Sequence, residues 1–203
     1  MTSLRSLTSP NFLPSMALLD DLIASYKRHI SLPFSSGLPF SQRVWFVVYP
    51  PDQERRLQLR LNDFENCARS ANLRWCRISL ENAFAQWMDS FDEDERSAYL
   101  HDVELSEDAA NPGFRDFLTK HISAHVIGVP ESERDRTVFA LTGLMELYDF
   151  LHVSEVIEGL DRKFPGILTV FFPGEREGNT YRFLGVRDGW DYLAVPILAD
   201  SHP

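Results

Sequence analysis

Cysteine, long apolar runs and a secretory leader pattern are what this sequence has least of. Its 203 residues include only two cysteines, Cys67 and Cys76, too few for a disulfide framework and without the spacing of a zinc site. No stretch reaches the roughly 18 apolar residues of a membrane span, and residues 1–15 lack the apolar core of a secretory signal. These absences predict a soluble protein of the reducing cytoplasm, without membrane contact.

Positive charge is also in deficit. Lys and Arg number 20 against 30 Asp and Glu, which gives a formal net charge of −10. Binding to nucleic acid or to an anionic membrane depends on basic surface that neutralises phosphate. The composition therefore predicts a protein partner and no direct contact with nucleic acid.

A phosphate-binding loop is missing as well. No Gly-x-x-x-x-Gly-Lys motif occurs, and Lys27, Lys120 and Lys163 do not follow a glycine. After the apolar run Val44–Tyr49 the chain continues with Pro50–Glu54, which holds two prolines without N–H groups and two carboxylates. Because such a turn disfavours phosphate, we expect neither ATP hydrolysis nor nucleotide binding.

The patterns of hydrolases and metal enzymes are absent too. No Gly-x-Ser-x-Gly elbow occurs. His121 and His125 are one helical turn apart, as in a zinc helix, but the Ile-Ser-Ala between them offers no general-base glutamate. We interpret both as core or interface histidines, and we predict no catalytic residue, no metal site and no cofactor.

What the sequence does have is an alternation of apolar runs and amphipathic stripes. Buried strands are predicted at Val44–Tyr49, Leu73–Ile78, Thr137–Leu141 and Ile167–Phe172. Apolar residues at three- and four-residue spacing predict helices between them, with Ser15, Ser79 and Ser154 as N-caps and Asn72 at one helix end. The fold class is therefore α/β: one domain with a mostly parallel central sheet of about four strands and helices on both faces.

The run Ile167–Phe172 is predicted to be the central strand, because it is apolar on both faces and bounded by Pro-Gly pairs. Two further runs, Thr180–Leu184 and Trp190–Pro196, flank Val186–Gly189, whose Asp-Gly pair suits a tight turn. They predict a C-terminal β-hairpin.

The domain boundaries follow from composition. Residues 1–14, rich in Ser, Thr and Pro, are predicted to be disordered or loosely attached, and residues 15–203 form the single domain. An acidic insert lies around 89–112. Between Asp89 and Asp108 the sequence has nine carboxylates but only one arginine and one histidine. It is interpreted either as a solvated insert or as a docking surface for a basic partner.

The candidate site lies at the strand ends. The segment Pro173–Asn179 leaves the carboxyl end of the central strand, where open α/β sheets place their binding crevices. One interpretation is a simple turn; the other is a charged protein interface formed with the end of the first strand. The interface candidates are Tyr49, Glu54, Glu175, Arg176 and Arg182. The carboxylates of Glu54, Glu175 and Glu177 leave open a metal-dependent nuclease.

Several short motifs carry a family resemblance. They are Leu38-Pro39-Phe40, Tyr49-x-Pro51-x-x-Glu54, Ile78-Ser79-Leu80 and, as the most specific block, Phe171-Phe172-Pro173-Gly174-Glu175-x-Glu177-Gly178-Asn179-Thr180-Tyr181-Arg182-Phe183. Together they resemble the BrxB family of bacterial BREX bacteriophage-exclusion systems. The resemblance runs from about Leu38 to Ile197 and is weakest between Phe91 and Arg134.

The resemblance implies a non-enzymatic adaptor or assembly subunit in phage defence. Its implied partners are other BREX proteins, a large BrxC-like ATPase and a PglZ-like phosphatase-fold protein, beside a DNA methyltransferase. The alternative function is a metal-dependent nuclease or other hydrolase that acts on foreign nucleic acid. The expected surface for the adaptor is the set of strand-end residues Tyr49, Glu54, Glu175, Arg176 and Arg182.

Overall fold

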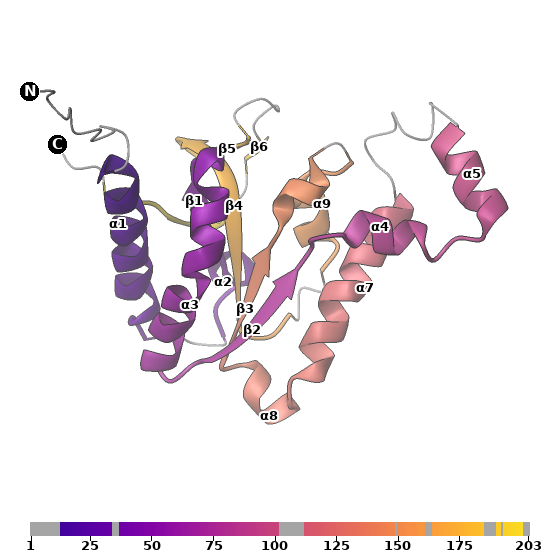
Figure 1. Ribbon diagram of the computed structural model, residues 1–203. Helices are drawn as coiled ribbons and strands as arrows, with labels where there is room; N and C mark the ends of the chain where they lie inside the picture. Colours follow the sequence, from indigo (N-terminus) through magenta and orange to yellow (C-terminus); the bar gives the residue numbers. More distant parts are fainter. Residues whose placement is uncertain are drawn as a thin grey trace, which may run out of the picture.

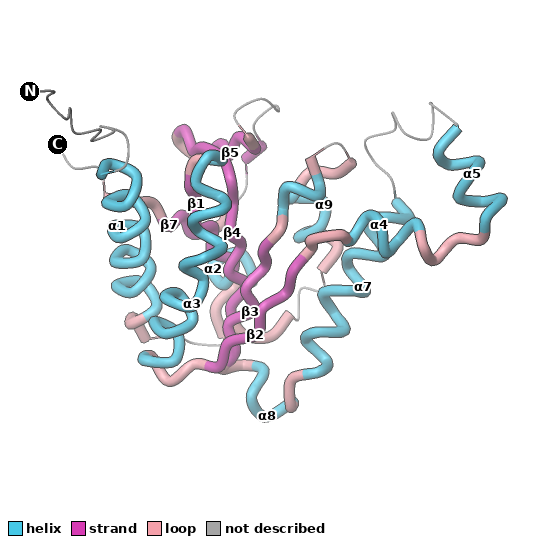
Figure 2. Tube along the Cα trace, viewed as in Figure 1, coloured by secondary structure: helices cyan, strands magenta, loops and turns pink. Residues whose placement is uncertain are grey.

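The structure is a computed structural model that describes residues 13–33, 37–101, 112–148, 150–160, 164–184, 190–191 and 193–200. Strands form one layer with helices on both sides (Figures 1 and 2). The helices, short 3-10 turns (η) and strands follow in the order α1 (Leu13–Ile30), α2 (Phe40–Arg43), β1 (Val44–Tyr49), η1 (Pro51–Gln53), α3 (Glu54–Ser70), β2 (Arg74–Ser79), α4 (Ala83–Met88), α5 (Glu93–His101), α7 (Pro112–Gly128), α8 (Glu131–Arg134), β3 (Thr137–Thr142), η2 (Leu144–Leu147), α9 (Val153–Glu158), β4 (Ile167–Glu177), β5 (Thr180–Phe183), β6 (Trp190–Asp191) and β7 (Val195–Ile197).

The sheet is mostly parallel, as the alternation of strands and helices predicts. Its strand order is β2-β3-β4-β1-β7, and every neighbouring pair in this order is parallel. β5 pairs antiparallel with the end of β4, and β6 pairs antiparallel with β5. The α/β class is therefore confirmed, and the run at Ile167 does lie in the middle of the sheet.

Strand β1 shows why the sheet needs helices on both faces. All six of its residues are buried, with Val44, Phe46 and Val48 in one core and Trp45, Val47 and Tyr49 in the other. Side chains alternate along a strand, so a fully apolar run must be covered on both sides. Helices α1 and α3 cover one face, and α4, α7 and α9 cover the other (Figure 2).

Aromatic rings link β1 and β4 to these two cores. Phe46 stacks on Phe172 with ring centroids 5.5 Å apart in one core. In the other core Phe64 of α3 meets Phe171 edge-on at 5.0 Å. Each such ring stabilises the fold by roughly 2–3 kcal/mol through burial of apolar surface. Adjacent residues of β4 thus contribute rings to the cores on opposite faces of the sheet.

The amino ends of β1 and β4 are joined by a buried arginine. Arg43, 7% exposed, donates to the carbonyl oxygens of Leu38 (3.0 Å), Gly166 (3.1 Å) and Phe164. Burial lowers the pKa of its guanidinium, and the negative charge of Asp135 partly offsets this. The guanidinium thus bonds carbonyls that precede both strands.

The predicted C-terminal hairpin forms in part. Trp190–Asp191 pairs antiparallel with Thr180–Tyr181, whereas Val195–Ile197 runs parallel to β1 at the edge of the sheet. One continuous strand from Trp190 to Pro196 is therefore wrong, because its two ends pair with different strands. The predicted turn Val186–Gly189 lies outside the described residues.

Helix starts were the least accurate part of the sequence prediction. Helix α1 begins at Leu13, not at Ser15. Ser79 is the last residue of β2, and Asn82, in the left-handed conformation, precedes α4. His152 and not Ser154 caps α9, where the Glu155 carboxylate accepts from the His152 N–H at 2.7 Å. None of the three serines is therefore the N-cap that the sequence suggests.

In the described part of the acidic insert, residues 89–101, the carboxylates are exposed, as a solvated insert predicts, but one aromatic residue is buried. Asp92 and Glu95 cap α5 reciprocally, with the Glu95 N–H 2.8 Å from Asp92 Oδ1. Tyr99 of α5 is buried and packs edge-on against Trp87, with ring centroids 5.3 Å apart. Residues 102–111 of the insert, like residues 1–12 of the predicted tail, lie outside the described residues. The first half of the insert therefore belongs to the packed domain.

Replacement of glycine by alanine should have opposite effects on the stability of the fold at two positions. Gly166 has φ +62, and an added Cβ would overlap the Thr137 carbonyl oxygen, so Gly166→Ala should destabilise the fold by about 2 kcal/mol or more. Gly128, at the end of α7, has no atom within 4 Å of an added Cβ, so Gly128→Ala should stabilise it by about 0.5 kcal/mol. Urea unfolding at neutral pH measures both, and equal shifts would contradict this account.

Candidate interaction site at the strand ends

The carboxyl ends of β1 and β4 lie side by side. Their register runs from Val44 opposite Leu168 to Tyr49 opposite Pro173. From this point β1 leads through η1 and α3 to β2 at one edge, while β4 leads through β5 and β6 to β7 at the other edge. The two connections thus run in opposite directions along the sheet, and such a reversal is where open α/β sheets place ligands.

In the turn after β1, two backbone N–H groups donate to carbonyls of the same turn. Pro50 and Pro51 have no N–H, the Gln53 N–H donates to the Pro50 carbonyl at 2.9 Å, and the Glu54 N–H donates to the Pro51 carbonyl. Glu54 also places a carboxylate in the first turn of α3. The turn thus offers few free donors and negative charge, which is a poor environment for a phosphate.

Tyr49 and Glu54, both predicted site residues, contact each other. The Tyr49 hydroxyl donates to Glu54 Oε2, and Gln58 Nε2 donates to Glu54 Oε1 at 2.8 Å. Tyr49 is buried, and burial raises the pKa of its phenol, with a further contribution from the negative charge of Glu54. The phenol therefore stays protonated and holds the carboxylate in place.

The segment predicted as a polar loop, Glu175–Asn179, is mostly strand. β4 continues past Pro173 to Glu177, and residues 174–177 pair antiparallel with β5 across a turn at Gly178 and Asn179. Gly178 has φ +61, which suits this turn. The loop prediction is therefore wrong: the antiparallel partner β5 extends β4 beyond its parallel neighbours.

Strand alternation sorts the charged residues of this hairpin into two sets. Glu175, Glu177 and Arg182 are exposed, and Arg182 lies opposite Glu175 in the register and 3.3 Å from Glu177 in an ion pair. Arg176 and Tyr181 point to the other side of the hairpin. The first set is defined here as the hairpin charge face: Glu175, Glu177 and Arg182.

Arg176 is turned toward the protein rather than outward. Its guanidinium lies over the ring of the buried Tyr181, 5.7 Å from the centroid, and donates to Asn179 Oδ1 at 3.3 Å. Burial raises the pKa of Tyr181, and the charge of Arg176 partly offsets the increase. The structure thus divides the predicted set into Tyr49 with Glu54, Glu175 with Arg182, and Arg176 alone.

One residue that sequence reasoning missed is Gly174, at the point where β4 leaves β1. A Cβ added there would overlap the Arg182 carbonyl oxygen and lie 2.6 Å from Cε1 of Phe172. The two strands approach so closely that only glycine fits. The Pro173-Gly174 pair marks this position in the sequence, where by itself it indicates only the end of a strand.

The two histidines are half-buried neighbours on α7. Their ring centroids are 4.8 Å apart, and His125 Nδ1 lies 2.9 Å from the His121 carbonyl oxygen. Burial lowers the pKa of His121, and His125 adds to the effect. Cys67 and Cys76 are both free thiols. Among the described residues no three His, Cys, Asp or Glu side chains are placed to hold a metal ion.

Comparison with protein-family models, curated proteins and solved structures finds no match for this chain. None of the helices in the described ranges has the length and apolar character needed to cross a membrane. The geometry of the strand ends is therefore the basis for a functional proposal.

The buried tyrosines predict alkaline instability. The pKa values of Tyr26, Tyr49 and Tyr181 are raised in the folded state, chiefly by burial, so their contribution is fully present below about pH 10 and lost as the pH rises above it. Tyr49→Phe removes one ionisation from the unfolded state. Its unfolding free energy should fall less steeply above pH 10, by up to about 1.4 kcal/mol per pH unit.

Urea unfolding at steps from about pH 9 to about pH 11 checks this difference. Lysine titration affects both proteins equally, so the difference between wild type and Tyr49→Phe reports the single phenol. Parallel pH curves for the two proteins would contradict the prediction.

Proposed function

We propose that this protein is a non-enzymatic adaptor of a BREX-type phage-defence complex, which joins a BrxC-like ATPase to a PglZ-like phosphatase-fold protein. The observation that carries the proposal is the hairpin charge face. The most specific block of the BrxB resemblance, Phe171 to Phe183, is the segment that builds this hairpin. The residues that suggest the family therefore also build an exposed, charged surface.

The charges of this face are available to a partner. Arg182 and Glu177 have 48% and 66% of their side-chain surface exposed, and an exposed ion pair of this kind contributes at most about 1 kcal/mol. A partner can therefore replace the internal pairing at little cost. Strand pairing on both sides of Gly178 holds the backbone in place, so little conformational entropy is lost on binding.

The same geometry weighs against the nuclease alternative. Catalysis by metal-bound water needs carboxylates that converge on the ion. Glu54 is instead held by Tyr49 and Gln58, and Glu177 is paired with Arg182. A mixed set of carboxylates and arginine suits recognition of another charged protein surface.

Reversal of the charges on this face tests the proposal. Glu175→Arg combined with Arg182→Glu should change the unfolding free energy by less than about 0.5 kcal/mol, because both side chains are exposed. Capture of the ATPase or of the phosphatase-fold protein should weaken on the order of a hundredfold, since like charges then face each other across the contact. Co-purification with each partner measures this, beside thermal melts.

A control is Glu65→Arg with Arg69→Glu, which reverses an ion pair of 2.6 Å on α3 whose arginine side chain is 69% and whose glutamate side chain is 25% exposed. This variant should capture both partners normally. Wild-type capture by the folded hairpin variant would show that the contact lies elsewhere. If Glu175→Gln alone abolished a nuclease activity while capture stayed normal, the adaptor role would be replaced by the enzymatic one.

A further inference from the structure

Strand β2 forms an edge of the sheet whose outer side carries no strand in the described part of the chain. It pairs with β3 alone. On the side that faces β3, the Arg74 N–H donates to the Arg136 carbonyl at 2.8 Å. Backbone groups of successive strand residues point to opposite sides. The N–H and C=O groups of Trp75 and Arg77 therefore point to the open side, where an added strand would meet them.

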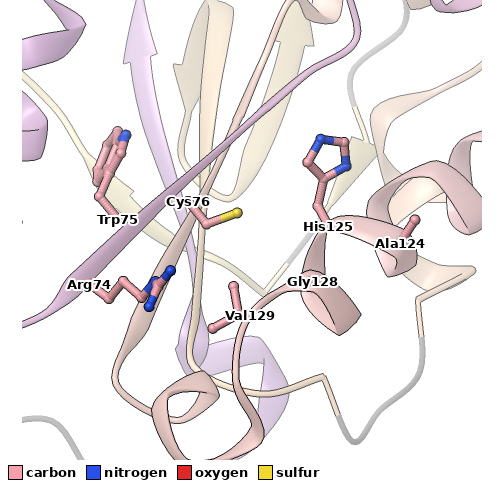
Figure 3. Close-up of a pocket in the computed structure, with 7 residues that line it drawn as sticks. All are labelled: Arg74, Trp75, Cys76, Ala124, His125, Gly128 and Val129. Carbon is pink, nitrogen blue, oxygen red and sulfur yellow. The ribbon is translucent and has the colours of Figure 1, made fainter.

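A groove of about 410 Å³ runs along this edge, between β2 and the last turns of α7 (Figure 3). Cys76 points into the groove from β2, and Trp75 lies on the opposite side of the strand. His125 and Gly128 line it from α7. We call this space the β2–α7 groove.

The wall of the groove on the side of α7 is formed partly by residues with small side chains or none. Ala124 and Gly128, one turn apart, present a methyl group and a bare backbone, and an added Cβ at Gly128 meets no atom within 4 Å. Val129, which directly follows α7, adds an apolar side chain to the lining. The groove is thus open and partly apolar, and it runs beside a strand edge to which no other described strand is paired.

The charges at this edge decide which occupant fits. Arg74 and Arg77 are exposed on β2; Arg74 pairs with Glu133, whereas Arg77 bonds the neutral Gln58 Oε1 at 2.9 Å. A second copy of this chain would bring the same arginines against each other across the edge, which is unfavourable. A segment with carboxylates would instead be attracted, although the chain as a whole carries a net charge of −10.

We propose that the open edge of β2 binds an extended acidic segment of a partner protein as an added strand. Side chains of that segment opposite Cys76 enter the β2–α7 groove, and the alternate ones lie on the side of Trp75 and Arg77. The segment therefore alternates apolar residues with Asp or Glu. This surface is separate from the hairpin charge face and does not depend on the proposed function.

A labelled peptide of about eight residues, alternating Val and Glu, is the probe. Its fluorescence anisotropy should rise saturably with the full-length protein, and less at high salt. The same peptide with Lys in place of Glu should not bind. Arg77→Glu should weaken binding on the order of tenfold, while Arg77→Lys, which keeps the charge, should retain it.

Backbone methylation separates strand addition from simple charge attraction. N-methyl groups on one alternate set of peptide amides should abolish binding, because those N–H groups face β2, and methylation of the other set should not. Gly128→Leu should fill the groove and weaken binding on the order of tenfold while urea unfolding shows a stable fold. The bound peptide should also slow alkylation of Cys76 but not of the buried Cys67.

Three results would overturn the proposal. They are equal effects of both methylation sets, unchanged affinity of Gly128→Leu, and binding of the Lys peptide as tight as that of the Glu peptide. A protein that is dimeric in size-exclusion chromatography with light scattering, and that becomes monomeric in Gly128→Leu, would assign the edge to a second copy instead.

Discussion

Parallel pairing of β1 with β4 is the contact on which the rest of the structure depends. Six consecutive residue pairs, from Val44 with Leu168 to Tyr49 with Pro173, join two strands that are buried on both faces. Because side chains alternate, these two strands supply aromatic and aliphatic residues to both cores at once. At the amino ends of this pair, Arg43 donates to the carbonyls of Leu38 and Gly166. The candidate site lies at the carboxyl ends.

Charged residues follow the carboxyl ends of this strand pair. β1 stops at two prolines, and its last residue, Tyr49, bonds to the first residue of α3, Glu54. β4 does not stop there; it continues into the hairpin with β5, whose inner side is covered by Tyr181 and Phe183. The β4–β5 hairpin therefore extends from the end of the sheet at which this class of fold receives ligands.

The two proposed surfaces lie on different parts of the sheet. The hairpin charge face extends from the central strand, and the open edge of β2 is two strands away, across β3. An adaptor that joins two partners needs separate contact surfaces, so that one partner does not exclude the other. One surface offers rigid mixed charge, and the other offers strand backbone beside a groove. These chemistries select different kinds of partner.

The sequence by itself determined the strand cores and the class of fold. The apolar run Val44–Tyr49 and the start of β4 at Ile167 were predicted with correct bounds, because burial on both faces and Pro or Gly at the ends are local signals. Of the site, the separate positions of Tyr49, Glu54, Glu175 and Arg182 at two strand ends followed from the same pattern.

Only the tertiary structure decided how these parts meet. The extension of β4 past Pro173, the inward turn of Arg176 and the choice of β2 as an open edge all depend on a partner strand distant in sequence. So does the split of the last predicted strand between β5 and β1. Local residue patterns encode which side chains must be buried, but pairing depends on which buried surfaces fit together, and no single segment contains that information.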